Sequence, residues 1–306
     1  MNNFTTKLIL SVLSFFALNT FGQYRLDYGG SIGIANYLGD IGGREKTRRD
    51  FVADMKMAKT RQALSGFVRY KFQPRLSVKA ELMYLRIAGD DKLSTNLGRQ
   101  YRNLNFTNDM FELSATGQFC FYENTDIGSD YRFRIAFRSY VGLGVGVFYS
   151  NPKTKYNGET VKLRPLMTEN VEYKPIGVCI PAVIGFNFTL KKRHRIGWEL
   201  NWRTTFTDYL DDISTVYADP KDIGNEAALV ANRSAELDQS KYPTTIKYSF
   251  LPGSKRGDPT HKDSYLTMNV SYSYVLRGKS SFYRSRYGSF FNKRGKRRTR
   301  KIRAKF

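Results

Sequence analysis

Cysteine and long apolar runs are both scarce in this chain of 306 residues. Its two cysteines, Cys120 and Cys179, are too few to build a disulfide scaffold. The one clear apolar run lies near the N-terminus, and it is shorter than the ~20 residues that a membrane-spanning helix needs. Any insertion of the mature chain into a bilayer must therefore use β-strands.

Histidine is equally rare, and this limits the catalytic chemistry that the chain can carry. Nucleophilic catalysis usually needs a histidine base beside Ser, Cys or Thr. Of the two histidines, His194 lies in a short basic turn. His261, between Asp258 and Asp263, is the single candidate for an enzymatic site. We expect a protein that is not an enzyme and that uses no cofactor.

The N-terminal residues have the pattern of a secretory signal peptide. Lys7 precedes an apolar stretch over residues 8–18, and Thr20-Phe21-Gly22 offers small residues where a signal peptidase cleaves. We predict that residues 1–22 are removed and that the mature chain begins at Gln23. The alternative is an ordinary apolar N-terminal helix.

Alternation of apolar and polar residues at every second position dominates the rest of the chain. Between Ile196 and Phe206, for example, Trp198, Leu200 and Trp202 alternate with polar residues. This period predicts β-strands with one apolar face and one polar face. On the resulting map the two cysteines fall on non-adjacent strands, so no bridge between them is expected. The eight predicted strands cover residues 24–38, 63–73, 76–90, 110–122, 133–147, 177–190, 196–206 and 266–274.

The connections between these strands alternate between long and short. Outer-membrane barrels show this asymmetry, with short periplasmic turns and long extracellular loops. A soluble eight-stranded barrel is the alternative, but strands of this length are unusual in soluble barrels. The long connections are residues 39–62, 91–109, 150–175 and 208–263; residues 74–75 and 191–195 are tight, and residues 123–130 are intermediate.

Charges of both signs lie at the centres of the polar strand faces. An eight-stranded barrel has an interior just wide enough to be filled by side chains. Because an unpaired buried charge is very costly, we expect these residues to form ion pairs inside the barrel. The alternative is that they face water on a sandwich. The residues are Arg69, Lys79, Glu81, Glu112, Arg134, Arg138, Glu199 and Arg203.

Four acidic residues follow the seventh predicted strand in this otherwise basic chain: Asp208, Asp211, Asp212 and Asp219. We interpret them as solvated residues at the extracellular rim, where short Asp side chains cap a turn at no cost in desolvation. A Ca²⁺ site is the alternative, since hard cations favour clustered carboxylates. Their spacing matches no EF-hand loop.

The C-terminal segment over residues 277–306 has thirteen basic residues and no acidic one. Aromatic residues are interleaved with them. The signal peptide argues against nucleic acid as the partner, although the composition alone would suggest it. An acidic protein, anionic lipid or a cell-wall polymer would fit the charge, and a solvated extension is the alternative. As partner-binding residues we single out Arg277, Arg284, Arg286, Lys293, Arg294, Arg297 and Arg298.

Two segments carry a resemblance to a known family. NWRTTFTDYLDDISTVYAD at 201–219 and ANYLGDIGG at 35–43 resemble the PorG-like outer-membrane β-barrel proteins of the Bacteroidetes type IX secretion system. The resemblance covers residues 24–276 and implies an eight-stranded barrel tied, on its periplasmic side, to a ring of PorK, a lipoprotein, and PorN. The signature residues, which the resemblance gives no defined role, are Tyr37, Leu38, Gly39, Asp40, Thr207, Asp208, Tyr209, Leu210, Asp211 and Asp212.

Together these patterns predict an all-β fold, an eight-stranded antiparallel transmembrane β-barrel of the outer membrane over residues 23–276. A signal peptide over residues 1–22 precedes it, and a basic periplasmic tail over residues 277–306 follows. The long loops would be extracellular and both termini periplasmic. The expected role is a structural anchor that contacts outer-membrane lipid and a PorK/PorN-type periplasmic ring, without nucleic acid. The alternatives are an adhesin or a small-solute pore, and a surface-acting barrel enzyme.

Overall fold

The computed structural model describes residues 25–41, 57–127, 135–237 and 250–276. The predicted signal peptide and the predicted basic tail, with all seven of its proposed partner-binding residues, lie outside these ranges.

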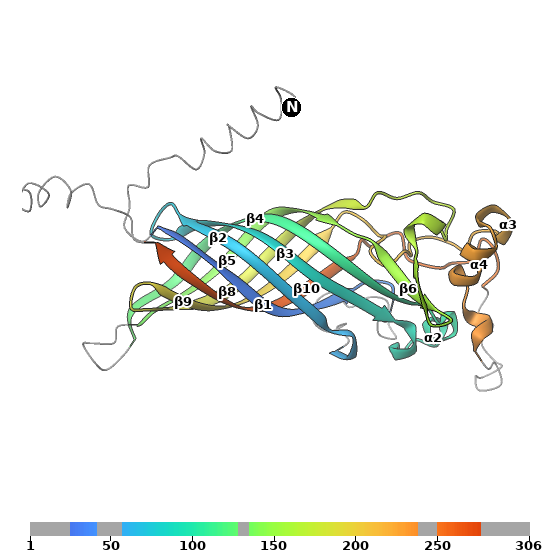
Figure 1. Cartoon of the computed structure of the whole chain (residues 1–306), viewed down its shortest axis with the longest axis horizontal. Helices are drawn as coiled ribbons and strands as arrows, with labels where there is room; N and C mark the ends of the chain where they lie inside the picture. Colours follow the sequence, from blue (N-terminus) through green and yellow to red (C-terminus); the bar gives the residue numbers. More distant parts are fainter. Residues whose placement is uncertain (1–24, 42–56, 128–134, 238–249, 277–306) are drawn as a thin grey trace, which may run out of the picture.

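Eight long strands of the described chain close into one antiparallel barrel (Figure 1). Each strand pairs with the next around the ring, and pairing between β1 and β10 joins the first strand to the last. All eight predicted strands are confirmed, and so is the predicted fold class of the barrel. The strands are β1 (Leu26–Leu38), β2 (Arg61–Lys71), β3 (Leu76–Asp90), β4 (Asn105–Ile127), β5 (Ile135–Tyr149), β8 (Ile176–Leu190), β9 (His194–Thr205) and β10 (Ser264–Leu276).

The largest departure from the predicted boundaries is β4, which is 23 residues long. Its first residues pair with the end of β3, so β4 begins at Asn105 and not at the predicted residue 110. Four of the five residues from Asn105 to Asp109 are polar, with Phe106 the exception, so the apolar alternation cannot be recognised in the sequence there. A hairpin of β6 (Pro152–Tyr156) and β7 (Glu159–Lys162) pairs with the same part of β4.

The barrel wall is apolar outside and polar inside. Leu143 and Val145 of β5 are each 64% exposed on the outer face. On the inner face Glu112 and Arg203 are 0% and 1% exposed. This polarity is the reverse of that of a soluble barrel and is the arrangement of a barrel whose outer surface meets lipid. The protein is therefore an outer-membrane β-barrel.

The two ends of the barrel differ. At one end, which we call the turn end, residues 72–75 and 191–193 connect neighbouring strands tightly. At the other, the loop end, lie the long connections and the short helices α2, α3 and α4 (Figure 1). No helix of the described residues is long and apolar enough to cross a membrane. The helices are η2 (Met57–Lys59), η3 (Asp91–Leu93), α2 (Leu97–Arg102), η4 (Arg164–Leu166), α3 (Pro220–Ile223), α4 (Asn225–Ala231) and η5 (Ser234–Glu236).

A buried apolar cluster extends into the loop end of the barrel. Leu210 and Ile213 from the β9–β10 loop belong to it, together with Tyr37, Phe106 and Tyr265 from the strands. Because the loops contribute to a shared core, they fold onto the barrel rather than extending freely into solvent.

Candidate functional site: the filled lumen and the closed loop end

A network of ion pairs occupies the lumen. Glu199 lies at its centre, 2.5 Å from the Lys79 ammonium and 3.2 Å from the Arg69 guanidinium. Lys79 also lies 3.0 Å from Glu81, and the Tyr140 hydroxyl donates to Glu199 at 2.6 Å. The prediction that these charges pair inside the barrel is confirmed for these residues.

A second lumen pair lies closer to the loop end. The Arg203 guanidinium is 2.6 Å from Glu112, and the Tyr265 hydroxyl donates to the same carboxylate at 2.8 Å. Toward the turn end, a third pair joins Arg138 to Glu123 at 3.5 Å. Of the predicted lumen charges, only Arg134 falls outside the described residues.

The inner wall is shaped to hold these large side chains. Gly144 and Gly146 of β5 face the lumen, and a Cβ on Gly144 would lie 2.2 Å from the Ala115 carbonyl oxygen. Cys179 is a free, buried thiol against Gly146, and Cys120 is also free and buried. The lumen is therefore filled by packed side chains, and its central charges are enclosed.

Asp263 joins the two signature segments at the loop end. The Tyr37 hydroxyl donates to one of its carboxylate oxygens at 2.5 Å, and the Leu210 backbone N–H donates to the other at 3.0 Å. The Tyr37 hydroxyl also accepts from the backbone N–H of Asp40 at 3.1 Å. Gly39 leaves room for this contact, since a Cβ there would lie 2.0 Å from the Tyr37 hydroxyl.

Three of the four acidic residues that follow the seventh strand are buried, so the expectation that they are solvated at the rim is wrong for those three; the fourth, Asp219, is partly exposed. Asp208, Asp211 and Asp212 are 4%, 1% and 2% exposed. Asp208 accepts from the Ser214 hydroxyl at 2.7 Å, and Asp212 accepts from the Tyr173 hydroxyl at 2.6 Å. The loops close over these groups, and this enclosure is not visible from their position in a loop of the sequence.

The capping part of the same interpretation is confirmed at two positions. Asp211 accepts from the backbone N–H of Ile213 at 3.0 Å, and Asp219 caps α3 by accepting from the backbone N–H of Lys221 at 3.0 Å. In the part of the chain that the structure describes, no group of three or more His, Cys, Asp or Glu side chains is arranged to hold a metal ion. The Ca²⁺ alternative therefore gains no support here.

Burial raises the pKa of these loop-end carboxylates. The pKa of Asp211 is raised well above its usual value by desolvation, then by the nearby charges of Asp263 and Asp40. Desolvation, with a further contribution from Asp208, likewise raises the pKa of Asp263. For Asp212 desolvation raises the pKa to about 6, although Arg256 opposes the shift. These carboxyl groups therefore stay protonated at pH values at which an exposed Asp is already ionised.

Two buried arginines tie the loops together. Arg102 of α2 forms an ion pair with Asp91 at 2.7 Å and donates to the carbonyl oxygens of Asp40 and Arg256. Arg256 in turn lies 3.0 Å from Glu169. These contacts connect all four long loops, and we call the resulting structure the loop-end cap.

Glu169 holds the β9–β10 loop in the same cap. Its carboxylate accepts from the backbone N–H groups of Ser214 at 3.1 Å and Thr215 at 2.9 Å. Neither Glu169 nor the two arginines of the cap were singled out from the sequence. Arg102 and Arg256 lie 154 positions apart, and no local pattern links them.

His261, the candidate for catalysis, lies in an exposed turn. Its Nδ1 is 3.2 Å from Asp258 and 2.9 Å from the Thr260 hydroxyl, and that hydroxyl also donates to Asp258. Asp263 is turned away into the cap, where it binds Tyr37. Asp258, Thr260 and His261 therefore form a local turn, and Asp263 is not part of it.

Comparisons with known proteins identify one matching family and several solved structures with weak similarity. A family model described as "Domain of unknown function (DUF6089)" matches residues 6–224. No curated protein matches the chain. Among solved structures, Neisserial surface protein A is similar, with 5% identity, a TM-score of 0.39 and coverage of 83% of this chain and 99% of that one.

Two further solved structures show comparable likeness. Ail of Yersinia pestis, in complex with the heparin analogue sucrose octasulfate, is 10% identical, with a TM-score of 0.33 and coverage of 82% and 99%. The N-terminal β-barrel domain of Pseudomonas aeruginosa OprF is 8% identical, with a TM-score of 0.32 and coverage of 82% and 99%. All three TM-scores are low. The barrel is defined by its own strand pairing and by the apolar side chains exposed on its outer face.

Proposed function

We propose that this chain, which belongs to the DUF6089 family, is a structural anchor of the outer membrane that holds a periplasmic assembly in place. The resemblance of its two signature segments suggests which assembly: the type IX secretion system, through a PorK/PorN-type ring. The turn end and both termini would face the periplasm, and the basic tail over residues 277–306 would be one contact with the ring.

The filled lumen is the observation that carries this proposal. Lys79, Glu199 and Arg69 are each less than 5% exposed and are paired with one another inside the barrel. A solute would have to break these pairs to pass, and eight strands leave no spare width for it. A closed barrel with a folded cap is suited to a mechanical role and poorly suited to conduction.

An adhesin is the second candidate, and the size of the loop-end cap favours it. The β9–β10 connection alone spans residues 206–263, and its described part includes the helices α3, α4 and η5. Leu251 and Phe206 are 69% and 65% exposed there. Exposed apolar side chains on a folded cap favour contact with a partner at the cell surface.

Affinity purification from detergent-solubilised outer membranes tests the anchor. We would compare the full-length protein with a form that stops after Leu276. This stop leaves β10 complete, because its pairing with β1 ends at Leu276. Mass spectrometry would identify copurifying proteins, and heat-modifiable mobility on gels would show that both forms contain a folded barrel.

The outcomes separate the candidates. Ring proteins that copurify only with the full-length form would support the anchor, with the tail as its contact. Ring proteins that copurify with both forms would support the anchor and assign the contact to the turn end. Absence of ring proteins from both folded forms would overturn the proposal in favour of an adhesin.

A further inference from the structure

Two glycines leave a trench in the outer wall of the barrel. Gly30 of β1 lies directly opposite Gly66 of β2, and both positions face outward. Across the sheet they continue in register to Tyr272 of β10 on one side and to Leu82 of β3 on the other. Three strand spacings separate Tyr272 from Leu82, or roughly 14 Å. No side chain fills this row between them.

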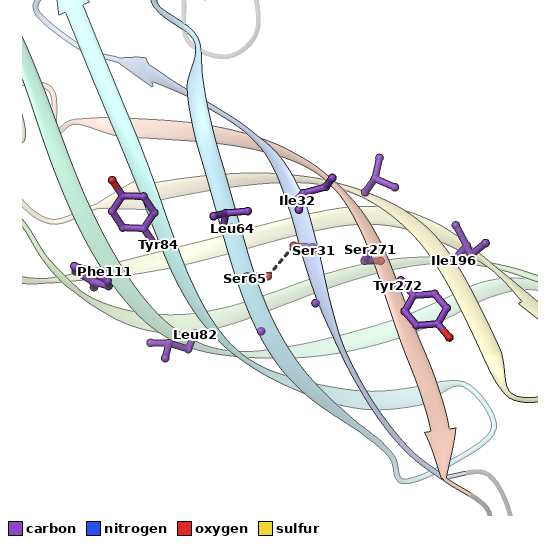
Figure 2. Close-up of a pocket in the computed structure, with 13 residues that line it drawn as sticks. Ser31, Ile32, Leu64, Ser65, Leu82, Tyr84, Phe111, Ile196, Ser271 and Tyr272 are labelled. Atoms are coloured by element: carbon purple, nitrogen blue, oxygen red, sulfur yellow. Dashed lines mark hydrogen bonds between the residues drawn. The ribbon is translucent and has the colours of Figure 1, made fainter.

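Large apolar side chains form the sides of the trench. Ile32 and Leu64 stand beside it, and Leu82 and Tyr272 lie at its ends (Figure 2). The groove has a volume of about 750 Å³ and extends to Ile196 of β9. Gly66 is its most open point, since a Cβ there would meet no atom within 4 Å. The surface is therefore a concave apolar channel on the face that meets lipid.

A polar cluster lies at the Tyr272 end of the trench. The Tyr272 hydroxyl is 2.8 Å from Nδ1 of His194, which is two residues before Ile196 on the same strand. Beside it, Arg193 donates to the Tyr274 hydroxyl at 3.0 Å. Both tyrosines face outward, so Arg193 and His194 extend along the outside of the barrel toward the headgroup region of the bilayer. Aromatic girdles mark that level in outer-membrane barrels.

Within the described residues, the basic side chains beside this cluster have no acidic partner. Lys191, Lys192 and Arg193 are all exposed, and no carboxylate of the described residues forms an ion pair with any of them. Arg195, the next basic residue, instead points inward to Asp27 at 2.7 Å. The outward cations are thus free to meet an external anion.

The backbone of this turn is also unusual. Arg193 N–H donates to the Leu190 carbonyl at 3.1 Å, and the two central residues, Lys191 and Lys192, have φ of 49° and 59°. A β-turn with positive φ at both central residues strongly prefers Asn-Gly there. Lysine is strained in this left-handed conformation, because its Cβ lies too close to the following carbonyl oxygen. Such local strain is typical of positions kept for function.

We propose that this face is a binding site for an anionic phospholipid of the surrounding bilayer. The headgroup phosphate lies at Arg193 and Lys192 beside the Tyr274 hydroxyl, and an acyl chain lies along the Gly30–Gly66 trench. Charge complementarity selects the headgroup, and the concave apolar channel selects the chain. A transmembrane segment of another protein would leave the cations at the end of the trench without a partner.

Native mass spectrometry of the full-length protein tests the site. It measures bound lipid directly, so the result does not depend on whether the protein also binds a periplasmic ring. The detergent-solubilised protein is titrated with phosphatidylglycerol or phosphatidylcholine. Gly66→Leu places a side chain in the trench without a clash, because a Cβ at Gly66 would meet no atom within 4 Å. Gly117→Leu is the matched control: it also faces outward, and its nearest neighbour would be the Leu143 carbonyl oxygen at 3.6 Å. Gly117 belongs to a different groove, which shares no lining residue with the trench.

We expect one phosphatidylglycerol to bind at least ten-fold more tightly than phosphatidylcholine. Gly66→Leu should weaken it ten-fold or more, whereas Gly117→Leu should leave it unchanged. Each of Arg193→Gln and Lys192→Gln should reduce the preference for the anionic lipid about five-fold. Millimolar inorganic phosphate should not compete, because it lacks the acyl chain.

Three results would overturn the site. One is equal binding of the two lipids to the unaltered protein; another is equal loss of binding from the two leucine variants. The third is competition by inorganic phosphate, which would indicate a simple anion site. Heat-modifiable mobility shows that each variant is folded. Quenching of Trp198 by brominated lipid in a Trp202→Phe background gives an independent readout, since Trp198 is next to the trench in register with Val270.

Discussion

Arg203 and Glu112 form an ion pair across the lumen, 2.6 Å apart, although their strands β9 and β4 are not neighbours in the sheet. Both side chains are almost completely enclosed. The pair therefore connects opposite walls of the barrel. The Tyr265 hydroxyl donates to Glu112, and the Thr267 hydroxyl accepts from Arg203.

Removal of one member of this pair should destabilise the barrel strongly. Glu112→Gln leaves the guanidinium buried without a counter-charge, and we expect the free energy of unfolding to fall by about 3–5 kcal/mol. The double variant Glu112→Leu/Arg203→Met removes both charges and should recover most of that loss. Urea unfolding in lipid vesicles measures both. Equal destabilisation by the single and the double variant would show that the pair itself is not the source.

Tyr37→Phe should loosen the loop-end cap while the barrel stays intact. The substitution removes the hydroxyl that donates to Asp263 and leaves a buried carboxylate oxygen unpaired, at a cost of about 1–3 kcal/mol. Limited proteolysis should cut the loop over residues 206–263 faster than in the unaltered protein. Tyr149→Phe, on the outer face of β5, is the control and should not change the rate. An unchanged rate in Tyr37→Phe would mean that this contact does not hold the cap.

The cap should become less stable as the pH rises. The folded pKa of Asp212 is raised to about 6 from an ordinary value of 3.8, so its contribution is present below pH ~4 and is lost as the pH rises through ~6. Asp211 and Asp263, also raised, extend this loss to higher pH. Hydrogen exchange in residues 206–237 should therefore be faster at pH 8 than at pH 5, after correction for the intrinsic exchange rate.

Substitution separates this effect from a general response to pH. Asp212→Asn cannot ionise and should weaken the pH dependence between pH 4 and 6. Asp219→Asn, which alters the cap of α3, should leave that dependence unchanged. If Asp212→Asn has the same profile as the unaltered protein, a different group is responsible.

The barrel could be predicted from the sequence because its signal is local. A strand between lipid and a packed lumen must alternate in polarity at every second residue, and eight segments do so. The same alternation placed Glu199 and Arg203 on one face, and the cost of an unpaired buried charge then implied that they are paired.

The loop-end cap could not be predicted in the same way. Its contacts join residues such as Tyr37 and Asp263, which are 226 positions apart, and loop residues carry no periodic signal. Asp208 and Asp211 were expected to be solvated because they follow a strand, yet the loops fold over them. The lipid-facing trench also depends on register: only the pairing shows that Gly30 lies opposite Gly66.

Replacement of the strained turn should separate stability from lipid selectivity. Lys191→Asn/Lys192→Gly supplies the residues that a β-turn with positive φ at both central positions prefers, and we expect the free energy of unfolding to rise by about 1 kcal/mol or more. The same change removes two exposed cations, so the preference for phosphatidylglycerol should fall. Lys191→Gln/Lys192→Gln is the matched control: it removes the same charges without relieving the backbone. It should lose the lipid preference with no gain in stability. If both variants keep the preference, these lysines play no part in lipid binding, and their strained conformation needs another explanation.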